Sequence, residues 1–176
     1  MTPSNLHIEH VPLEKRDHFL QMAKCYWHEI MPQSAILKSQ EAIQAYFIDT
    51  FTWNNGNKHP YWALCNTEPV GFISIELEHD SNTTDSKQAY VHDFYIASRH
   101  RRKGYGAKLV HWLFSHLDPL GIERLDLNVR RDNPNALAFW QAQGFGIAGY
   151  SMRMYRNPHI GTAYKGVLSS NFVNEE

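Results

Sequence analysis

Residues 100–110, His100 to Val110, read HRRKGYGAKLV. Basic side chains run directly into two glycines that are one residue apart, and an amphipathic pattern follows them. The preceding segment, AYVHDFYIAS at 89–98, is rich in aromatic and β-branched residues and is predicted to be a strand. A strand, a basic glycine turn and a helix in this order favour an anion site, because the first turn of a helix carries unpaired backbone N–H groups and a partial positive charge.

The two glycines would let phosphate oxygens approach the backbone closely. Gly104 and Gly106 meet that need, and residues 101–103 add positive charge. Two common phosphate motifs do not match. A P-loop places its lysine after the glycines, and a dinucleotide fingerprint has a third glycine where this chain has Leu109.

Composition indicates a folded domain and argues against several classes of protein. The chain has 176 residues, 43% of them hydrophobic, and a net charge of -1, which is unlike a protein that binds nucleic acid or membrane through its overall charge. Two cysteines do not suggest a disulfide framework, and the scattered histidines predict no metal site. The N-terminus has no pattern of a secretory signal, and no apolar run is long enough to span a bilayer, so a cytoplasmic location is expected.

Apolar periodicity along the chain predicts one domain of mixed α/β (α+β) type. Strands are expected at 6–11, 61–65, 70–78, 89–98 and 122–129, with one or two more within 146–156. Helices are expected at 13–31, 39–51, 104–117 and 133–143. The last helix has Asn133 as its N-cap, Pro134 at its first position and Gly144 just past its end. This order predicts a central mixed sheet with helices on its faces.

Two segments carry a resemblance to a known family. Residues 101–106 fit the pattern [RQ]-x-x-G-x-[GA], and residues 133–145, NPNALAFWQAQGF, fit N-x-x-A-x-x-[FL]-Y-x-x-x-G-F in all but one position. Together they resemble the GNAT superfamily of N-acetyltransferases over roughly residues 70–150. The resemblance implies a single domain over 1–176, with a core at about 5–156, a tail at 157–176, and a twisted, mostly antiparallel sheet splayed at its fourth strand.

The resemblance also implies acetyl-coenzyme A as co-substrate, with its pyrophosphate on the backbone N–H groups from Arg102 to Ala107. Its pantetheine amides would pair with the backbone of Phe94 and Ile96, and Asn133 with its helix would flank the arm. The residues implied in cofactor binding are Phe94, Tyr95, Ile96, Arg101, Arg102, Lys103, Gly104, Tyr105, Gly106, Ala107, Asn133 and Ala136.

Acetyl transfer to an amine needs a base, because an alkyl amine with a pKa near ~10.4 is almost fully protonated at neutral pH. The segment VHDFYI at 91–96 most resembles the polyamine acetyltransferase branch. His92 stands where many relatives carry a glutamate and is the candidate base, while Asp93 could anchor a cationic substrate or act as a structural hydrogen-bond acceptor. Neighbours in a regular strand point to opposite faces, so both can reach one site only if a β-bulge intervenes, as is usual in the family.

Trp140 departs from the family, which often has at this position a tyrosine that protonates the leaving thiolate. An indole N–H can donate a hydrogen bond but cannot act as an acid at ordinary pH. Trp140 is therefore a candidate that stacks on the end of the pantetheine arm or hydrogen-bonds the sulfur, with core packing as the alternative.

The expected function is acetyl transfer from acetyl-coenzyme A directly to a primary amine of a small molecule, with no nucleic-acid or membrane partner. Relatives are often dimers, so a homodimer is a further expectation. Three alternatives stay open: acetylation of protein N-termini or lysines, a module that binds an acyl-coenzyme A without transferring it, and a nucleic-acid binder that uses the basic run.

Overall fold

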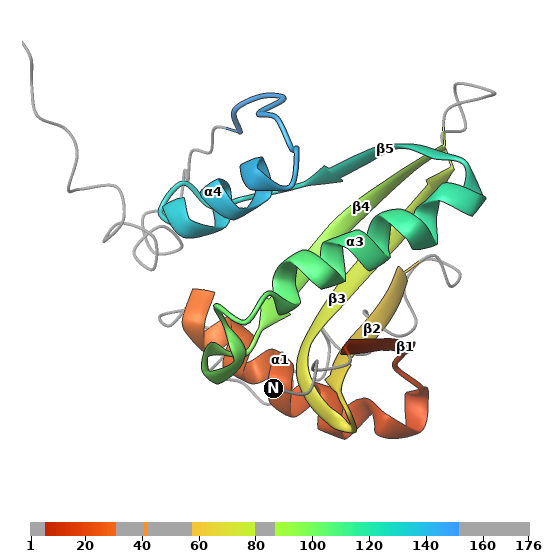
Figure 1. Cartoon of the computed structure of the whole chain (residues 1–176), viewed down its shortest axis with the longest axis vertical. Coiled ribbons are helices and arrows are strands. Elements are labelled where there is room, and N and C mark those ends of the chain that lie inside the picture. The colour runs from red at the N-terminus through yellow and green to blue at the C-terminus, as the bar shows by residue number, and fades with distance from the viewer. Residues whose placement is uncertain (1–5, 31–40, 42–57, 80–86, 152–176) are drawn as a thin grey trace, which may run out of the picture.

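The computed structural model describes residues 6–30, 41, 58–79 and 87–151. Its centre is a five-stranded sheet in the order β1-β2-β3-β4-β5 (Figure 1). Neighbours from β1 to β4 are antiparallel, whereas β5 runs parallel to β4. The strands are β1 (Leu6–His10), β2 (Lys58–Cys65), β3 (Glu68–His79), β4 (Lys87–Ile96) and β5 (Ile122–Leu127). The predicted mixed, mostly antiparallel sheet is confirmed.

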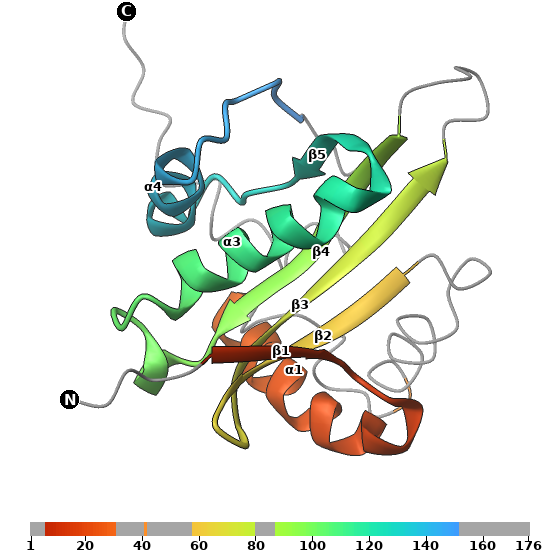
Figure 2. The ribbon, with the colours of Figure 1, turned by 45° about the vertical axis from the view of Figure 1, so that its right-hand side comes forward.

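Helices cover both faces of this sheet (Figures 1 and 2). The long helix α3 (Tyr105–Leu117) and the short helix α4 (Pro134–Ala142) lie on one face, and α1 (Arg16–Ile30) lies on the other. Short 3-10 turns occupy Leu13–Lys15, Ser98–His100 and Asp118–Leu120. This arrangement agrees with the prediction of helices on both faces.

The core on the α3 face forms because α3 has one continuous apolar stripe. Leu109, Leu113 and Leu117 recur at a spacing of four residues and are at most 3% exposed. They belong to one cluster with Ile75 and Val91 of the sheet. Burial of each such side chain contributes about 1.5–3 kcal/mol, so this stripe fixes α3 against the sheet.

The core on the opposite face is built mainly from aromatic side chains. Phe19 and Ala23 on α1 are one helical turn apart and are both buried. The Phe19 ring lies edge-on to Trp62 and Phe72, with ring centroids 5.3 and 4.9 Å away. Tyr95 of β4 belongs to the same cluster, so α1 rests directly on the fourth strand.

The start and end of α4 follow the predicted capping chemistry. Oδ1 of Asn133 accepts a hydrogen bond from the backbone N–H of Ala136 at 3.1 Å, and Pro134 is the first helical residue. Gly144 adopts φ +95°, the left-handed conformation that ends a helix. The capping residues predicted for α4 are therefore confirmed; they act through contacts within a few residues.

The strands predicted within 146–156 are wrong for the part that the structure describes, because residues 145–151 form no strand. Gly146 and Gly149 weaken any strand here, and the side chains of Ile147 and Tyr150 are 55% and 90% exposed, so no burial compensates. The remaining residues of that prediction lie outside the described residues. So do the tail predicted at 157–176 and, apart from Glu41, the helix predicted at 39–51.

Strands β4 and β5 separate partway along their length. They pair from Lys87 opposite Ile122 to Val91 opposite Leu127, and no pair follows. The last five residues of β4, His92–Ile96, continue beside β3 but pair with none of the described strands on their β5 side. The predicted splay at the fourth strand is therefore present, and it opens the space in which the candidate site lies.

Candidate functional site

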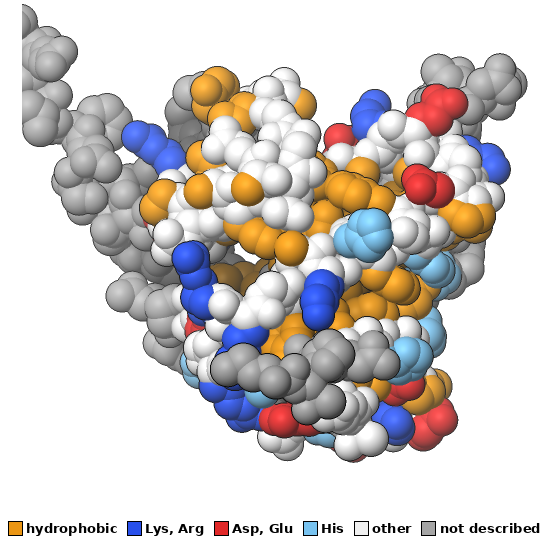
Figure 3. All heavy atoms as spheres, viewed as in Figure 1, with side chains coloured by type: hydrophobic (Ala, Val, Ile, Leu, Met, Phe, Trp, Pro, Cys, Tyr) orange, Lys and Arg blue, Asp and Glu red, His pale blue; other side chains and the backbone are white. Residues whose placement is uncertain are grey.

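A cleft of about 1350 Å³ opens where β4 and β5 diverge. Its walls come from the end of β4, the turn between β4 and α3, the segment after β5, the inner side of α4 and the C-terminal end of α1. Figure 3 shows the hollow between the part of the molecule that carries α4 and the turn before α3, with basic side chains beside its mouth. The cleft therefore joins the predicted phosphate turn to the predicted catalytic strand.

The start of α3 has the features of an anion site. Gly104 is the N-cap residue of α3 with φ +79°, and as a glycine it has no side chain to cap the first N–H groups of the helix. Arg102 also has a positive φ of 61°. Because the N–H groups of the first turn have no acceptor within the helix, a bound anion would satisfy them and meet the positive end of the helix dipole.

The two glycines of this turn are required for different reasons. A Cβ added to Gly104 would meet no atom within 4 Å, so it is the left-handed conformation, with φ +79°, that favours glycine there. A Cβ added to Gly106 would lie 3.1 Å from the Phe139 ring of α4. Gly106 thus allows α3 and α4 to approach one another, a packing role that the sequence did not indicate.

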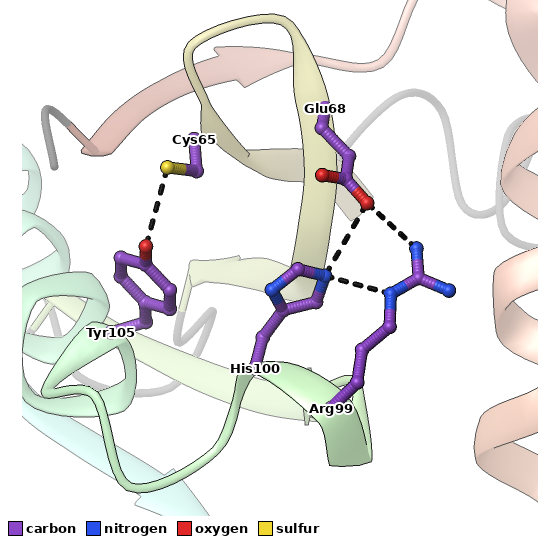
Figure 4. Close-up of polar contacts among 5 residues, drawn as sticks. All are labelled: Cys65, Glu68, Arg99, His100 and Tyr105. Carbon is purple, nitrogen blue, oxygen red and sulfur yellow. Dashed lines mark hydrogen bonds and ion pairs between the residues drawn. The ribbon is translucent and has the colours of Figure 1, made fainter.

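Polar contacts fasten this turn to the hairpin between β2 and β3 (Figure 4). Glu68 in the hairpin accepts a hydrogen bond from Arg99 at 2.8 Å and lies 3.5 Å from Nε2 of His100. The hydroxyl of Tyr105 donates to Sγ of Cys65 at 3.2 Å. The Arg99 hydrogen bond is the main reason why the pKa of Glu68 is lowered. These contacts hold both ends of the turn, and His100 also lines the cleft.

Arg101 is held by the protein itself. Its Nε donates to the carbonyl of Ile96 at 2.7 Å, and its guanidinium forms an ion pair with Glu29 at the end of α1. The hydroxyl of Tyr95 donates to the other oxygen of Glu29 at 2.7 Å. Burial and Glu29 raise the pKa of Tyr95. Arg101 therefore ties α1 to the end of β4, and the exposed Arg102 and Lys103 add further positive charge to the turn.

His92 is the extra residue of a β-bulge. Asp93 pairs with Ser74 and Val91 pairs with Ile75, so His92 has no partner in the register of β3 and β4. The bulge changes the alternation of β4, and both His92 and Asp93 point toward the α1 side of the sheet, where each contacts a side chain of β3. The β-bulge that these two residues need in order to face the same side of the sheet is therefore present.

The two residues have different surroundings. Asp93 is 8% exposed and accepts a hydrogen bond from the hydroxyl of Ser74 at 2.8 Å. Burial, together with the Asp93 charge, raises the pKa of Tyr26. His92 lines the cleft, and its Nε2 lies 2.5 Å from Oε2 of Glu76. The structure thus favours Asp93 as a buried hydrogen-bond acceptor, and of the two residues it is His92 that lines the cleft.

Trp140 belongs both to the core and to the wall of the cleft. It is 6% exposed, and its ring lies 4.9 Å from Phe94, 5.2 Å from Phe139 and 4.9 Å from Phe145, measured between centroids. Asn133 and Ala136 line the same cleft from the first turn of α4. The cleft therefore has an aromatic wall on the side of α4.

Two acidic residues of the site were missed at the sequence level. Glu76 lies in the alternating run of β3, and Glu29 lies in the last turn of α1. Neither belongs to a motif, and each is recognised only through its partner on another element. No group of three or more His, Cys, Asp or Glu side chains within 6–30, 58–79 and 87–151 is placed to hold a metal ion. Of the helices described, none is long and apolar enough to cross a membrane.

Comparisons with known proteins agree on one family. The sequence profile described as "Acetyltransferase (GNAT) family" matches residues 21–145. A protein of Methanocaldococcus jannaschii, named an uncharacterized N-acetyltransferase, is 25% identical over 97 residues, which are 54% of this chain and 43% of that protein. The match thus spans less than half of that relative's length.

Solved structures of similar fold include two aminoglycoside acetyltransferases. One, from an uncultured soil metagenomic sample and in complex with trehalose, has a TM-score of 0.67 at 17% identity and covers 89% of this chain and 99% of its own. The other, AAC(6')-Iy in complex with a bisubstrate analogue, has a TM-score of 0.67 at 13% identity and covers 88% of this chain and 99% of its own. Similarity at this level of identity shows the shared fold.

Proposed function

Because this chain belongs to the GNAT family of acetyltransferases, we propose that it transfers an acetyl group from acetyl-coenzyme A directly to a primary amine of a small molecule. One observation carries the proposal: the uncapped first turn of α3 and the imidazole of His92 line the same cleft. The structural neighbours that are aminoglycoside acetyltransferases support a small amine as acceptor.

The residues of the turn fit a phosphate group. The first N–H groups of α3 have no side-chain cap, and the space beside Gly104 is open. In the proposal these N–H groups hold the pyrophosphate, while Arg102 and Lys103 add charge near it. The backbone of Phe94 and Ile96, on the edge of β4 that β5 leaves unpaired, is proposed to bind the pantetheine arm.

The chemistry divides between the co-substrate and the protein. Acetyl-coenzyme A supplies the activated acetyl thioester. His92 takes a proton from the acceptor amine, directly or through one water, because an amine is a nucleophile only when it is uncharged. Phe94 and Trp140 exclude water from the wall of the cleft, and solvent protonates the thiolate that leaves, since an indole cannot act as the acid.

A second candidate follows from Trp140. Its ring is packed among three phenylalanines in the position where the family often places a tyrosine, and this favours a module that holds an acyl-coenzyme A without transferring it. The acetyltransferase and the binding module would use the same coenzyme A site, and only the acetyltransferase would transfer the acetyl group. The cytoplasm is the proposed compartment for either, because Cys25 and Cys65 are both free thiols.

The test is release of thiol from acetyl-coenzyme A in the presence of polyamines, amino acids, aminoglycosides and short peptides in turn. Release that depends on a small amine is the expected result, and His92→Gln should reduce it by about 100-fold or more, the usual contribution of a positioned base. Release only with peptides would point to a protein acceptor. Binding of acetyl-coenzyme A without release for any amine would instead support the binding module.

A further inference from the structure

We propose that Glu76 is the positioning residue for His92, so that a carboxylate and an imidazole act together as the base of the transfer. This inference rests on the proposed function. The closest approach in the pair is 2.5 Å, between Nε2 of His92 and Oε2 of Glu76. The Glu76 side chain is 12% exposed and therefore mostly shielded from solvent, whereas the His92 side chain is 28% exposed and borders the cleft.

The charge around Glu76 determines which side chain, Glu76 or His92, donates the hydrogen bond between them. Lys58 stands directly opposite Glu76 in the register of β2 and β3, and it is only 7% exposed. Register partners in antiparallel strands have their side chains on one face, so a cation shares the environment of this carboxyl group. An ionised Glu76 can only accept a hydrogen bond, and therefore Nε2 of His92 carries the proton that lies between them.

This assignment leaves Nδ1 of His92 as the ring nitrogen with a free lone pair. The proton of the acceptor amine moves to Nδ1, the N–H bond of the amine breaks as its electron pair becomes the nucleophile, and the imidazole becomes an imidazolium. Glu76 keeps its negative charge and stabilises that imidazolium through the same hydrogen bond. The carboxylate thus acts through His92 and does not itself touch the acceptor.

The neighbouring groups fix the orientation of the ring. The Tyr90 ring lies 4.8 Å from the His92 ring between centroids, at 57°. Other ionisable groups described on this side of the sheet include Asp93, which accepts from a serine, Tyr95, and two residues of α1, Tyr26 and Glu29. Both oxygens of Glu29 already accept hydrogen bonds from other side chains. Among the described carboxylates, Glu76 is the one bonded to the His92 imidazole.

The first test is a titration that does not require activity. The ring C–H signal of His92, assigned by its loss in His92→Gln, is followed by NMR against pH in the wild type and in Glu76→Gln. The titration midpoint should move down, because the substitution removes an opposite charge that favours the imidazolium. Glu123→Gln, which removes an exposed carboxylate on β5, is the charge-matched control and should leave the midpoint in place.

The second test is kinetic. Glu76→Gln should lower kcat about tenfold, leave KM for acetyl-coenzyme A unchanged and move the acidic limb of kcat downward by the same amount as the NMR midpoint. Glu76→Asp should recover part of the rate. A midpoint that stays in place, or one that moves while kcat and its pH profile do not, would overturn the positioning role. A wild type that acetylates no amine would overturn the proposed function instead, and the titration would still decide whether Glu76 controls the proton on His92.

Discussion

Gly104 offers the most direct test of the anion site, because the chain contains a matched control for it. Gly104 has φ +79°, and Gly121, which follows the 3-10 turn after α3, has φ +68°. A Cβ would meet nothing within 4 Å at Gly104 and only the Lys87 side chain, at 4.0 Å, at Gly121. Alanine at either position should therefore cost about 1–2 kcal/mol of left-handed strain and little else. For a chain of this size such a cost lowers Tm by about 2–8 °C.

The two variants should differ in their affinity for coenzyme A. Gly104 lines the cleft, and its added methyl group would stand in the space that a phosphate needs to reach the N–H groups of α3. A hydrogen bond to a charged group contributes about 1.5–3 kcal/mol, so losing one would weaken binding by about 10- to 100-fold. Gly121→Ala should bind like the wild type.

Calorimetric titration with coenzyme A and thermal melts of the same samples measure both quantities. The expected result is two similar losses of Tm and one loss of affinity, in Gly104→Ala. Equal affinity in both variants would show that the turn before α3 does not hold the phosphate, and the basis of the cofactor site would then be lost. Equal loss of affinity in both would assign the effect to general destabilisation of α3.

Three further variants test other features of the structure. Gly106→Ala should lose about 1–3 kcal/mol of stability from crowding against Phe139, and Phe139→Leu in the same chain should restore part of it, as a double-mutant cycle on unfolding would measure. Arg102→Gly should raise Tm by a few degrees, about 2–4 °C for each kcal/mol of left-handed strain released, while coenzyme A binding weakens most at low salt. Burial lowers the pKa of His59 and of His116 below the ordinary value of 6.5, so the unfolded chain binds more protons there. Tm should consequently fall as the pH drops below about 6.5, and a melt series in His59→Gln should show a weaker dependence.

Features that depend on one segment could be predicted from the sequence. The N-cap Asn133 and the terminating Gly144 define α4 through contacts within a few residues. The apolar stripe of α3 follows from a spacing of three and four residues. The glycine turn and the segment at 133–145 were sufficient to indicate the family because both signals are local, and the profile match at 21–145 confirms it.

Features that depend on strand register could not be predicted in the same way. Glu76 and His92 are 16 residues apart in sequence, and Glu29 and Arg101 are 72 apart, so only the folded sheet brings each pair together. Residues 101–103 were interpreted as charge for phosphate, yet Arg101 is held by Glu29. A charged residue in a motif can therefore be used by the fold as well as by a ligand.

The cleft and the placement of the candidate base have one structural origin. Val91 is the last residue of β4 that pairs with β5, and His92 is the next residue and also the bulge against β3. A bulge increases the local twist of its strand, so it carries the end of β4 away from β5 and opens the space that the pantetheine arm is proposed to fill. The same bulge places both His92 and Asp93 on the α1 side of the sheet, where His92 meets Glu76. The sheet therefore splits at His92, the residue that is proposed to take the proton. The bulge alone accounts for both the opening of the cleft and the position of the base beside it.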